Sequence, residues 1–365
     1  MPGDTIARLF SPTPSETDSG VLNYALRRLL TLPVVLFALS LMLFALQMSL
    51  SPTQRLAAYA PSPDFLKGGQ ESIRRMIEQY GLNDPFHVQY GRWIGNIMTG
   101  NLGWSETARQ PVSHALTSLL PATLELVLLA FIPSFLLAIY LGSRAGIYLN
   151  KWPDHLIRIF TILGWSFPVY VFGLLMLLIF YSALDWFPPG RLSQWAQATV
   201  MSSDFTRYTG ANTIDAILNG NFQILWDSLR HLAAPVITLT YVNLASMTRV
   251  MRTSMLETLR QDYVRTARAK GMPKRVVELR HARRNALLPV TTIAGMELAT
   301  MMGGVVITET IFDYAGLGQF AAKSAANLDF PAILGFSLYF AIVLVLMNLI
   351  VDLIYPLLDP RVKTR

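Results

Sequence analysis

The sequence predicts an all-α protein, a polytopic bundle of about six transmembrane helices, and three observations support this. The chain has 365 residues, of which 52% are apolar and 15% are charged, whereas soluble domains carry about 25% charged residues. Several uncharged runs approach the roughly 20 residues that a helix needs to cross the hydrocarbon core of a membrane. The net charge is +7, and most basic residues stand beside these runs, which indicates membrane orientation rather than nucleic-acid binding.

The N-terminal segment 1–20 is rich in Ser, Thr and Pro and has no apolar periodicity, so a disordered cytoplasmic tail is expected there. The apolar run 29–50 is too long for the core of a signal peptide and lacks a small-x-small cleavage site. We therefore interpret it as an uncleaved first span, with Arg27 and Arg28 on its cytoplasmic side. The transmembrane domain extends over 21–362.

Five further spans follow, and the fourth is the least apolar because it contains Pro235 and several hydroxyl residues. Such residues are tolerated where neighbouring helices satisfy the backbone, so this span is expected inside the bundle. With six spans that start inside, both termini are cytoplasmic and the basic run Arg249–Arg284 is cytoplasmic too. The five spans lie at roughly 120–142, 156–181, 232–251, 287–308 and 331–355.

The segments 51–119 and 182–231 are then extracytoplasmic. The first contains two apolar stripes with helical spacing, the second of which follows the helix-start signal Asn83-Asp84-Pro85. Two short amphipathic helices are predicted, forming a cap over the outer mouth of the bundle. The stripes are Ile73, Met76, Ile77 and Tyr80, and then Tyr90, Trp93, Ile94, Ile97 and Met98.

Enzyme chemistry has no support in the sequence. The chain has no Cys, no H-E-x-x-H or G-x-S-x-G pattern and no phosphate-binding G-x-x-x-x-G-K-[ST] loop, and its five His residues are scattered. No catalytic residue, cofactor site or metal site is therefore expected. A secondary transporter or channel is the rival class, because Glu125 and Glu297 lie within spans without an obvious basic partner. Glu297 is a candidate for lining a transport path, and a buried structural carboxyl is an equally good interpretation.

The cytoplasmic loop 252–288 carries the most specific signal. Met255, Leu259, Tyr263 and Ala267 are four residues apart, which places them on one face of a helix. Gly271 and Pro273 then form a helix stop and a new helix start. We expect a helix–turn–helix hairpin that docks on a partner. The alternative is a basic loop that only sets the topology.

This loop resembles a known family. Its residues DYVRTARAKGMP (262–273) and RHARRNALLPV (280–290) resemble the "EAA" loop of inner-membrane permeases of ATP-binding-cassette importers, in the dipeptide/oligopeptide/nickel branch. Ala267 and Gly271 match the second alanine and the glycine of that signature, whereas Arg265 and Thr266 replace its first two letters. Four more blocks, 80–105, 110–126, 229–239 and 309–335, resemble the same branch, most of all the first permease of its pair.

The resemblance implies a type I importer permease fold over about residues 22–362, in a bacterial inner membrane. It implies that this chain is not an enzyme and that it contacts a second homologous permease, an extracytoplasmic substrate-binding protein and two cytoplasmic ATPase domains, which bind the ATP and Mg. Peptides are the implied substrates, and oligosaccharide or nickel are alternatives. The residues implied in contact with the ATPase are Leu259, Asp262, Tyr263, Ala267, Lys270, Gly271, Met272 and Pro273.

Overall fold

The computed structural model describes residues 33–56 and 69–358, with side chains as far as residue 350. The predicted tail 1–20 lies outside these residues. The described chain is almost entirely helical, as predicted; its β structure is one antiparallel pair, β1 (Trp104–Ser105) and β2 (Gln110–Pro111).

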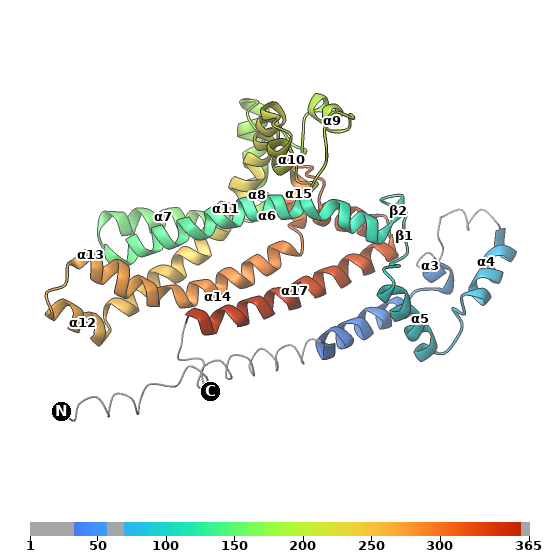
Figure 1. The fold of residues 1–365 in the computed structure, drawn as a ribbon, viewed down its shortest axis with the longest axis horizontal. Helices are drawn as coiled ribbons and strands as arrows, with labels where there is room; N and C mark the ends of the chain where they lie inside the picture. The colour runs from blue at the N-terminus through green and yellow to red at the C-terminus, as the bar shows by residue number, and fades with distance from the viewer. Residues whose placement is uncertain (1–32, 57–68, 359–365) are drawn as a thin grey trace.

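Four long helices form the body of the molecule and run side by side along its long axis (Figure 1). Helix α11 contacts α6 and α14, and α14 contacts α17. The hydroxyl residues Thr238, Thr248 and Ser254 of α11 are buried, which confirms the prediction that this least apolar span sits inside the bundle. The four helices are α6 (Val112–Ile147), α11 (Phe222–Leu259), α14 (Arg283–Met302) and α17 (Phe330–Leu358).

By length and composition, α6 and α17 can each cross a membrane on their own. A third crossing is made if α7 (Trp152–Ser166) is counted together with α8 (Val169–Met176) and the π-helix η2 (Leu177–Ala183). Of the first predicted span, the structure describes an apolar helix over Pro33–Met48. The predicted fourth and fifth spans lie on α11 and α14, which are long enough but more polar than a helix exposed to lipid.

Two of the predicted spans are not single straight helices. The expected span 156–181 bends by 99° between α7 and α8, at Phe167-Pro168, because proline lacks an N–H group and disfavours helical geometry in the residue before it. The expected span 287–308 ends at Met302. There Gly304 has a φ of +105°, and the chain turns before α15 (Val306–Ile311) and α16 (Leu317–Ala326).

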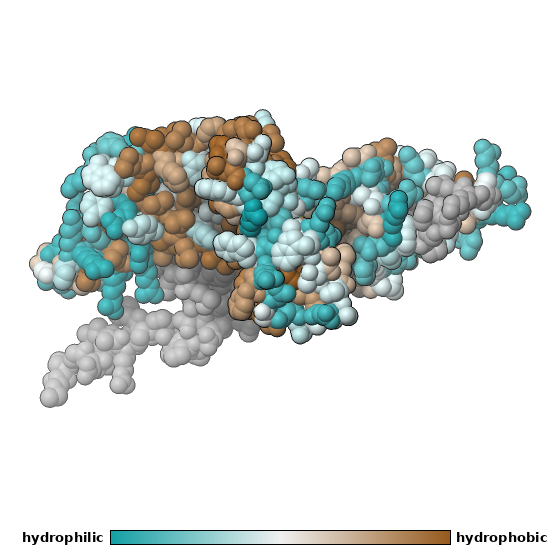
Figure 2. Space-filling view, turned by 90° about the horizontal axis from the view of Figure 1, so that it is seen from above, coloured by the Kyte–Doolittle hydropathy of each residue, from teal (hydrophilic) through white to brown (hydrophobic). Residues whose placement is uncertain are grey.

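Side chains on the outside of the bundle match a membrane environment. Large apolar residues of α7 are exposed, among them Leu156, Ile159 and Leu163. Figure 2 shows an apolar zone between a hydrophilic end of the molecule and a more hydrophilic region further along. The short helices α9 (Gln194–Val200) and α10 (Asn212–Leu218) lie on the opposite side of α6 from α17 (Figure 1).

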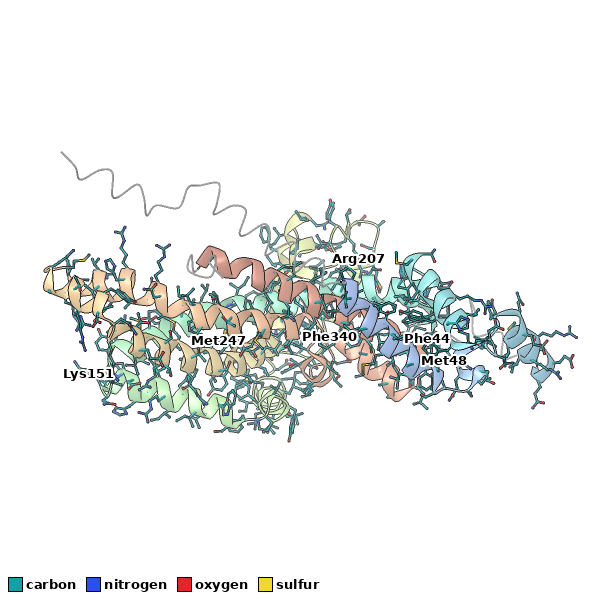
Figure 3. All side chains as sticks on the ribbon, turned by 90° about the horizontal axis from the view of Figure 1, so that it is seen from below. Phe44, Met48, Lys151, Arg207, Met247 and Phe340 are labelled. Atoms are coloured by element: carbon teal, nitrogen blue, oxygen red, sulfur yellow. The ribbon has the colours of Figure 1, made fainter. Side chains whose placement is uncertain are left out.

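The two predicted amphipathic helices exist as α4 (Gly69–Gln79) and α5 (Phe86–Met98), preceded by the short α3 (Pro52–Leu56). The α5 residues Tyr90 and Trp93 pack around Phe44 of the first helix, which Figure 3 labels. The α4 stripe packs instead on Leu56 and Leu82. Helix α4 therefore extends beyond the end of the bundle (Figure 1) and does not lie over its mouth as predicted.

Helices α6 and α11 approach each other unusually closely. A Cβ atom added at Gly142 would lie 2.5 Å from Cβ of Met251 and 2.8 Å from the Thr248 carbonyl oxygen, and one at Gly146 would lie 2.7 Å from Cβ of Met255. In membrane proteins, small residues spaced by four allow such approach. Along this face of α6 the buried small residues are Ala130, Ser134, Ala138, Gly142 and Gly146.

We expect Gly142→Ala to destabilise the protein by about 1–3 kcal/mol, because the added methyl collides with backbone and forces α6 and α11 apart. The matched control is Gly95→Ala on α5, where nothing lies within 4 Å of an added Cβ and alanine favours the helix. Thermal unfolding of the purified protein in detergent measures both. Equal midpoints for Gly142→Ala and the wild type would show that the close approach is not required.

Candidate functional site: the basic hairpin

The predicted hairpin forms one end of the molecule (Figure 1). The four-residue stripe predicts one continuous helix for its first arm, but in the structure this arm is broken. Helix α11 ends at Leu259 and α12 begins at Asp262, because Gln261 adopts an extended conformation between them. Met255 and Leu259 therefore lie on α11, whereas Tyr263 and Ala267 lie on α12. The elements of the hairpin are α12 (Asp262–Ala269), the turn 270–273, α13 (Lys274–Val276) and the π-helix η3 (Val277–Ala282), which continues into α14.

The turn at Gly271 has the predicted geometry. Gly271 has a φ of +74°, its N–H donates to the Arg268 carbonyl at 2.9 Å, and the Met272 N–H donates to the Ala267 carbonyl at 3.3 Å. This is the Schellman ending of a helix, which strongly favours glycine. No atom lies within 4 Å of an added Cβ, so the backbone conformation alone explains the glycine.

An apolar cluster joins the hairpin to the bundle. Val264 and Ala267 of α12 and Val277 of η3 are buried together with Met251 and Met255 of α11. Ala267 is only 8% exposed. It therefore packs in the protein's own core, so substitutions at Ala267 act first on the hairpin itself.

A buried ion pair fixes the base of the hairpin. Arg252 donates from Nε and Nη2 to the two oxygens of Asp154, at 2.7 and 2.9 Å, and the Asn150 N–H donates to the same carboxylate at 3.0 Å. Asp154 is fully buried, and such bidentate pairs are geometrically specific. The pair joins the end of α11 to the start of α7, 98 residues away in the sequence, which is why sequence reasoning missed it.

A second polar contact holds the two arms of the hairpin together. The Asn285 amide of α14 donates to the Tyr263 hydroxyl of α12 at 2.7 Å. Tyr263 is nevertheless 42% exposed. Of the other residues predicted to contact an ATPase, Asp262, Lys270, Gly271 and Pro273 are exposed, whereas Leu259 and Met272 are half-buried. The exposed face is basic, since Arg265, Arg268 and Lys274 are also exposed.

Glu297 lies on α14 and faces α11. Its Oε1 atom accepts a hydrogen bond from the Ser246 hydroxyl, and its Oε2 atom is buried without a partner among the described residues. The carboxyl thus points into the bundle, as predicted. Its role in a transport path stays a prediction.

Glu125, for which no basic partner was expected, has one. The Arg191 guanidinium lies 3.7 Å from its carboxylate, which also accepts hydrogen bonds from the Thr213 N–H at 2.7 Å and the Tyr314 hydroxyl at 3.1 Å. Burial, and then the nearby Glu125 charge, raise the pKa of Tyr314, so its hydroxyl remains a donor. Arg191 precedes α9 in a region without regular periodicity, so the sequence gives no signal of this network.

A neighbouring carboxyl, Glu309, is fully buried and satisfied in the same way. It accepts from the Thr123 hydroxyl at 2.7 Å and from the Gln319 N–H at 2.8 Å. Together the two carboxyls fasten α10, α15 and α16 to α6. Among the described residues, no three His, Asp or Glu side chains are grouped as metal ligands.

Membrane-length apolar helices around a more polar central helix, with a basic hairpin at one end, define a polytopic membrane protein. The family model described as "Binding-protein-dependent transport system inner membrane component" matches residues 134–364. The chain belongs to this family, and it is therefore an inner-membrane permease subunit of an ATP-binding-cassette importer.

The chain is similar to several curated permeases along most of its length. It is 40% identical to the probable D,D-dipeptide transport system permease protein of Escherichia coli, over 80% of this chain and 84% of that protein. It is 35% identical to the dipeptide transport system permease protein of Alkalihalophilus pseudofirmus, over 94% and 100%. It is also 32% identical to the glutathione transport system permease protein of Salmonella paratyphi A, over 94% and 99%.

We expect Arg252→Leu to destabilise the protein by about 3–5 kcal/mol, because Asp154 then stays buried without its counter-charge. The double variant Arg252→Leu/Asp154→Leu should be more stable than Arg252→Leu alone. As a control, Arg74→Leu breaks an exposed pair with Glu78 and should change little. Thermal unfolding distinguishes them; a double variant less stable than Arg252→Leu would contradict the assigned role of the ion pair.

Proposed function

We propose that this chain forms half of a peptide translocation path, beside a second homologous permease, and that its hairpin transmits force from a cytoplasmic ATPase. Two ATPase domains would bind the ATP and Mg and carry out hydrolysis. An extracytoplasmic binding protein would deliver the substrate. This chain then supplies the path and the moving arm, and no catalytic group. The observation that supports this most is the exposed glycine turn on a base held by an ion pair and an apolar cluster.

The mechanism follows from how the hairpin is attached. Alternating access is an equilibrium between two states that a partner can bias only through contacts that differ between them. Movement of an ATPase that holds the exposed turn would displace α12, and the Arg252–Asp154 pair and the buried cluster would carry this displacement to α11, α7 and α6. Since α11 contacts most of the bundle, the path would change shape as a whole.

The proposal that the substrate is a peptide rests on the names of the relatives, which include dipeptide, oligopeptide and glutathione permeases. Oligosaccharide and nickel remain the alternatives. Uptake of labelled dipeptide, oligosaccharide and nickel by the reconstituted importer decides among them. Glu297 is proposed to line the path, since its carboxyl lies at the polar contact between α11 and α14.

We expect Gly271→Val to abolish most ATP-driven uptake while leaving the bundle folded. Valine at positive φ costs about 1–2 kcal/mol, and this strain distorts an exposed turn only. Gly271→Asn should retain much of the uptake, because asparagine tolerates this conformation. Uptake and substrate-stimulated ATP hydrolysis in reconstituted vesicles are the measurements.

The matched control is Gly220→Val. Gly220 has a φ of +65° and an equally empty surrounding, and it ends α10 with the same hydrogen-bond pattern, but at the other end of α11. It incurs the same local strain away from the hairpin and should preserve coupling. Normal uptake by Gly271→Val, or an equal loss in Gly220→Val, would contradict the coupling role.

The proposed orientation places the hairpin in the cytoplasm and α4 outside the cell. Because the chain has no Cys, single cysteines can be introduced without further changes, at exposed Gln70 on α4 and at exposed Lys270 in the turn. We expect an impermeant maleimide to label Gln70→Cys from outside intact spheroplasts and Lys270→Cys only after lysis. The reverse pattern would reject the orientation.

A further inference from the structure

A pocket of about 520 Å³ lies between the end of α6 and the second arm of the hairpin. From α6 it is lined by Tyr140, Arg144 and Tyr148, and from the hairpin and the start of α14 by Lys274, Arg275 and Arg283. Basic residues from two elements thus converge on one cavity. The coupling role described above does not use this pocket.

The pocket has more positive charge than its own carboxylate balances. Glu278 is the acidic residue in its lining, and it is already 3.7 Å from Lys274. Within the described parts of the chain, Arg144, Arg275 and Arg283 have no carboxylate within ion-pair distance. Three guanidinium groups around a cavity attract an anion that can accept several hydrogen bonds, such as a phosphate group.

Two aromatic side chains contact the guanidinium of Arg144 and restrict its position. Its guanidinium carbon lies 5.3 Å from the ring centre of Tyr140 and 6.0 Å from that of Tyr148. These contacts favour a cation next to the rings and restrict the side chain without neutralising its charge. Less conformational freedom is then lost when an anion binds.

Along the face of α6 that lines the pocket, the type of side chain changes in the same order as the layers of a membrane leaflet. Leu136, Tyr140, Arg144 and Tyr148 follow one another at intervals of four, so they form one stripe. Leu136 and Tyr140 are 60% and 53% exposed. Going towards the hairpin end, the stripe is first apolar and then aromatic and basic, which matches acyl chains followed by the headgroup layer.

We propose that this pocket binds the phosphate of an anionic phospholipid headgroup, with an acyl chain along Leu136. The inference rests on the proposed orientation, in which this end faces the cytoplasmic leaflet. Basic pockets between helices on that side suit anionic headgroups. Because Arg144 comes from α6 and Arg275 from the hairpin, one bound phosphate joins the two and steadies the hairpin against the bundle.

The test uses the complete importer purified in nanodiscs of phosphatidylethanolamine, with and without phosphatidylglycerol. We expect phosphatidylglycerol to remain bound through delipidation, as counted by mass spectrometry, and Arg144→Gln/Arg283→Gln to retain it about tenfold less. The control is Lys151→Gln, at the same end of the molecule (Figure 3) but outside the pocket, and it should retain the lipid fully.

Five outcomes would overturn the proposal, and the first four concern the lipid and the variants. They are equal retention of phosphatidylethanolamine, equal loss in Lys151→Gln, unchanged retention in the double variant, and displacement of the lipid by millimolar inorganic phosphate, which would assign the site to a soluble anion. Retention only after removal of the ATPase subunits would also overturn it, since a partner then covers the pocket. Uptake measured in parallel separates these results from the proposed function, because an importer that transports but retains no lipid contradicts only the lipid site.

Discussion

The close packing of α6 against α11 is the contact around which the bundle is arranged. At Gly142 and Gly146 there is no room for a Cβ atom between the two helices. Because α11 lies this close to α6, the polar residues of α11 that face α6 are shielded from lipid. Without a hydrophobic driving force inside lipid, such van der Waals contact is a main source of helix association. It also explains why a helix with buried Thr238 and Thr248 can occupy the centre of a membrane bundle.

The packing of α6 against α11 also determines where the hairpin lies. Met251 and Met255, which cover the two glycines, belong to the same buried cluster as Val264 and Ala267 of α12. Immediately beside them, Arg252 binds Asp154. The contact between helices, the ion pair and the base of the hairpin are thus one continuous region, and only the turn around Gly271 extends beyond it. A proposed ATPase contact at that turn would therefore act on the bundle as a whole.

Sequence patterns predicted the helical class, the central place of α11, the existence of the amphipathic helices α4 and α5 and the left-handed turn at Gly271, because each depends on local spacing or local backbone conformation. The rest depends on contacts between distant residues. The 99° bend at Pro168 and the break after Met302 divide runs whose hydropathy is continuous. Ala267 was placed on one continuous helical stripe with Met255 and Leu259, because the helix break at Gln261 has no signal in the spacing. The partners of Glu125 and Arg252 come from residues 66 and 98 positions away.

A distance measurement within the assembled importer tests whether the hairpin moves as one body with the bundle. Spin labels on Lys270→Cys in the turn and Lys151→Cys before α7, both exposed, report on the hairpin and on the bundle at its base. For a hairpin fixed to the bundle, we expect a single narrow distance distribution that is unchanged between the resting and ATP-bound importer. A distribution that broadens or shifts on ATP binding would show that the hairpin hinges at its base and does not move with the bundle.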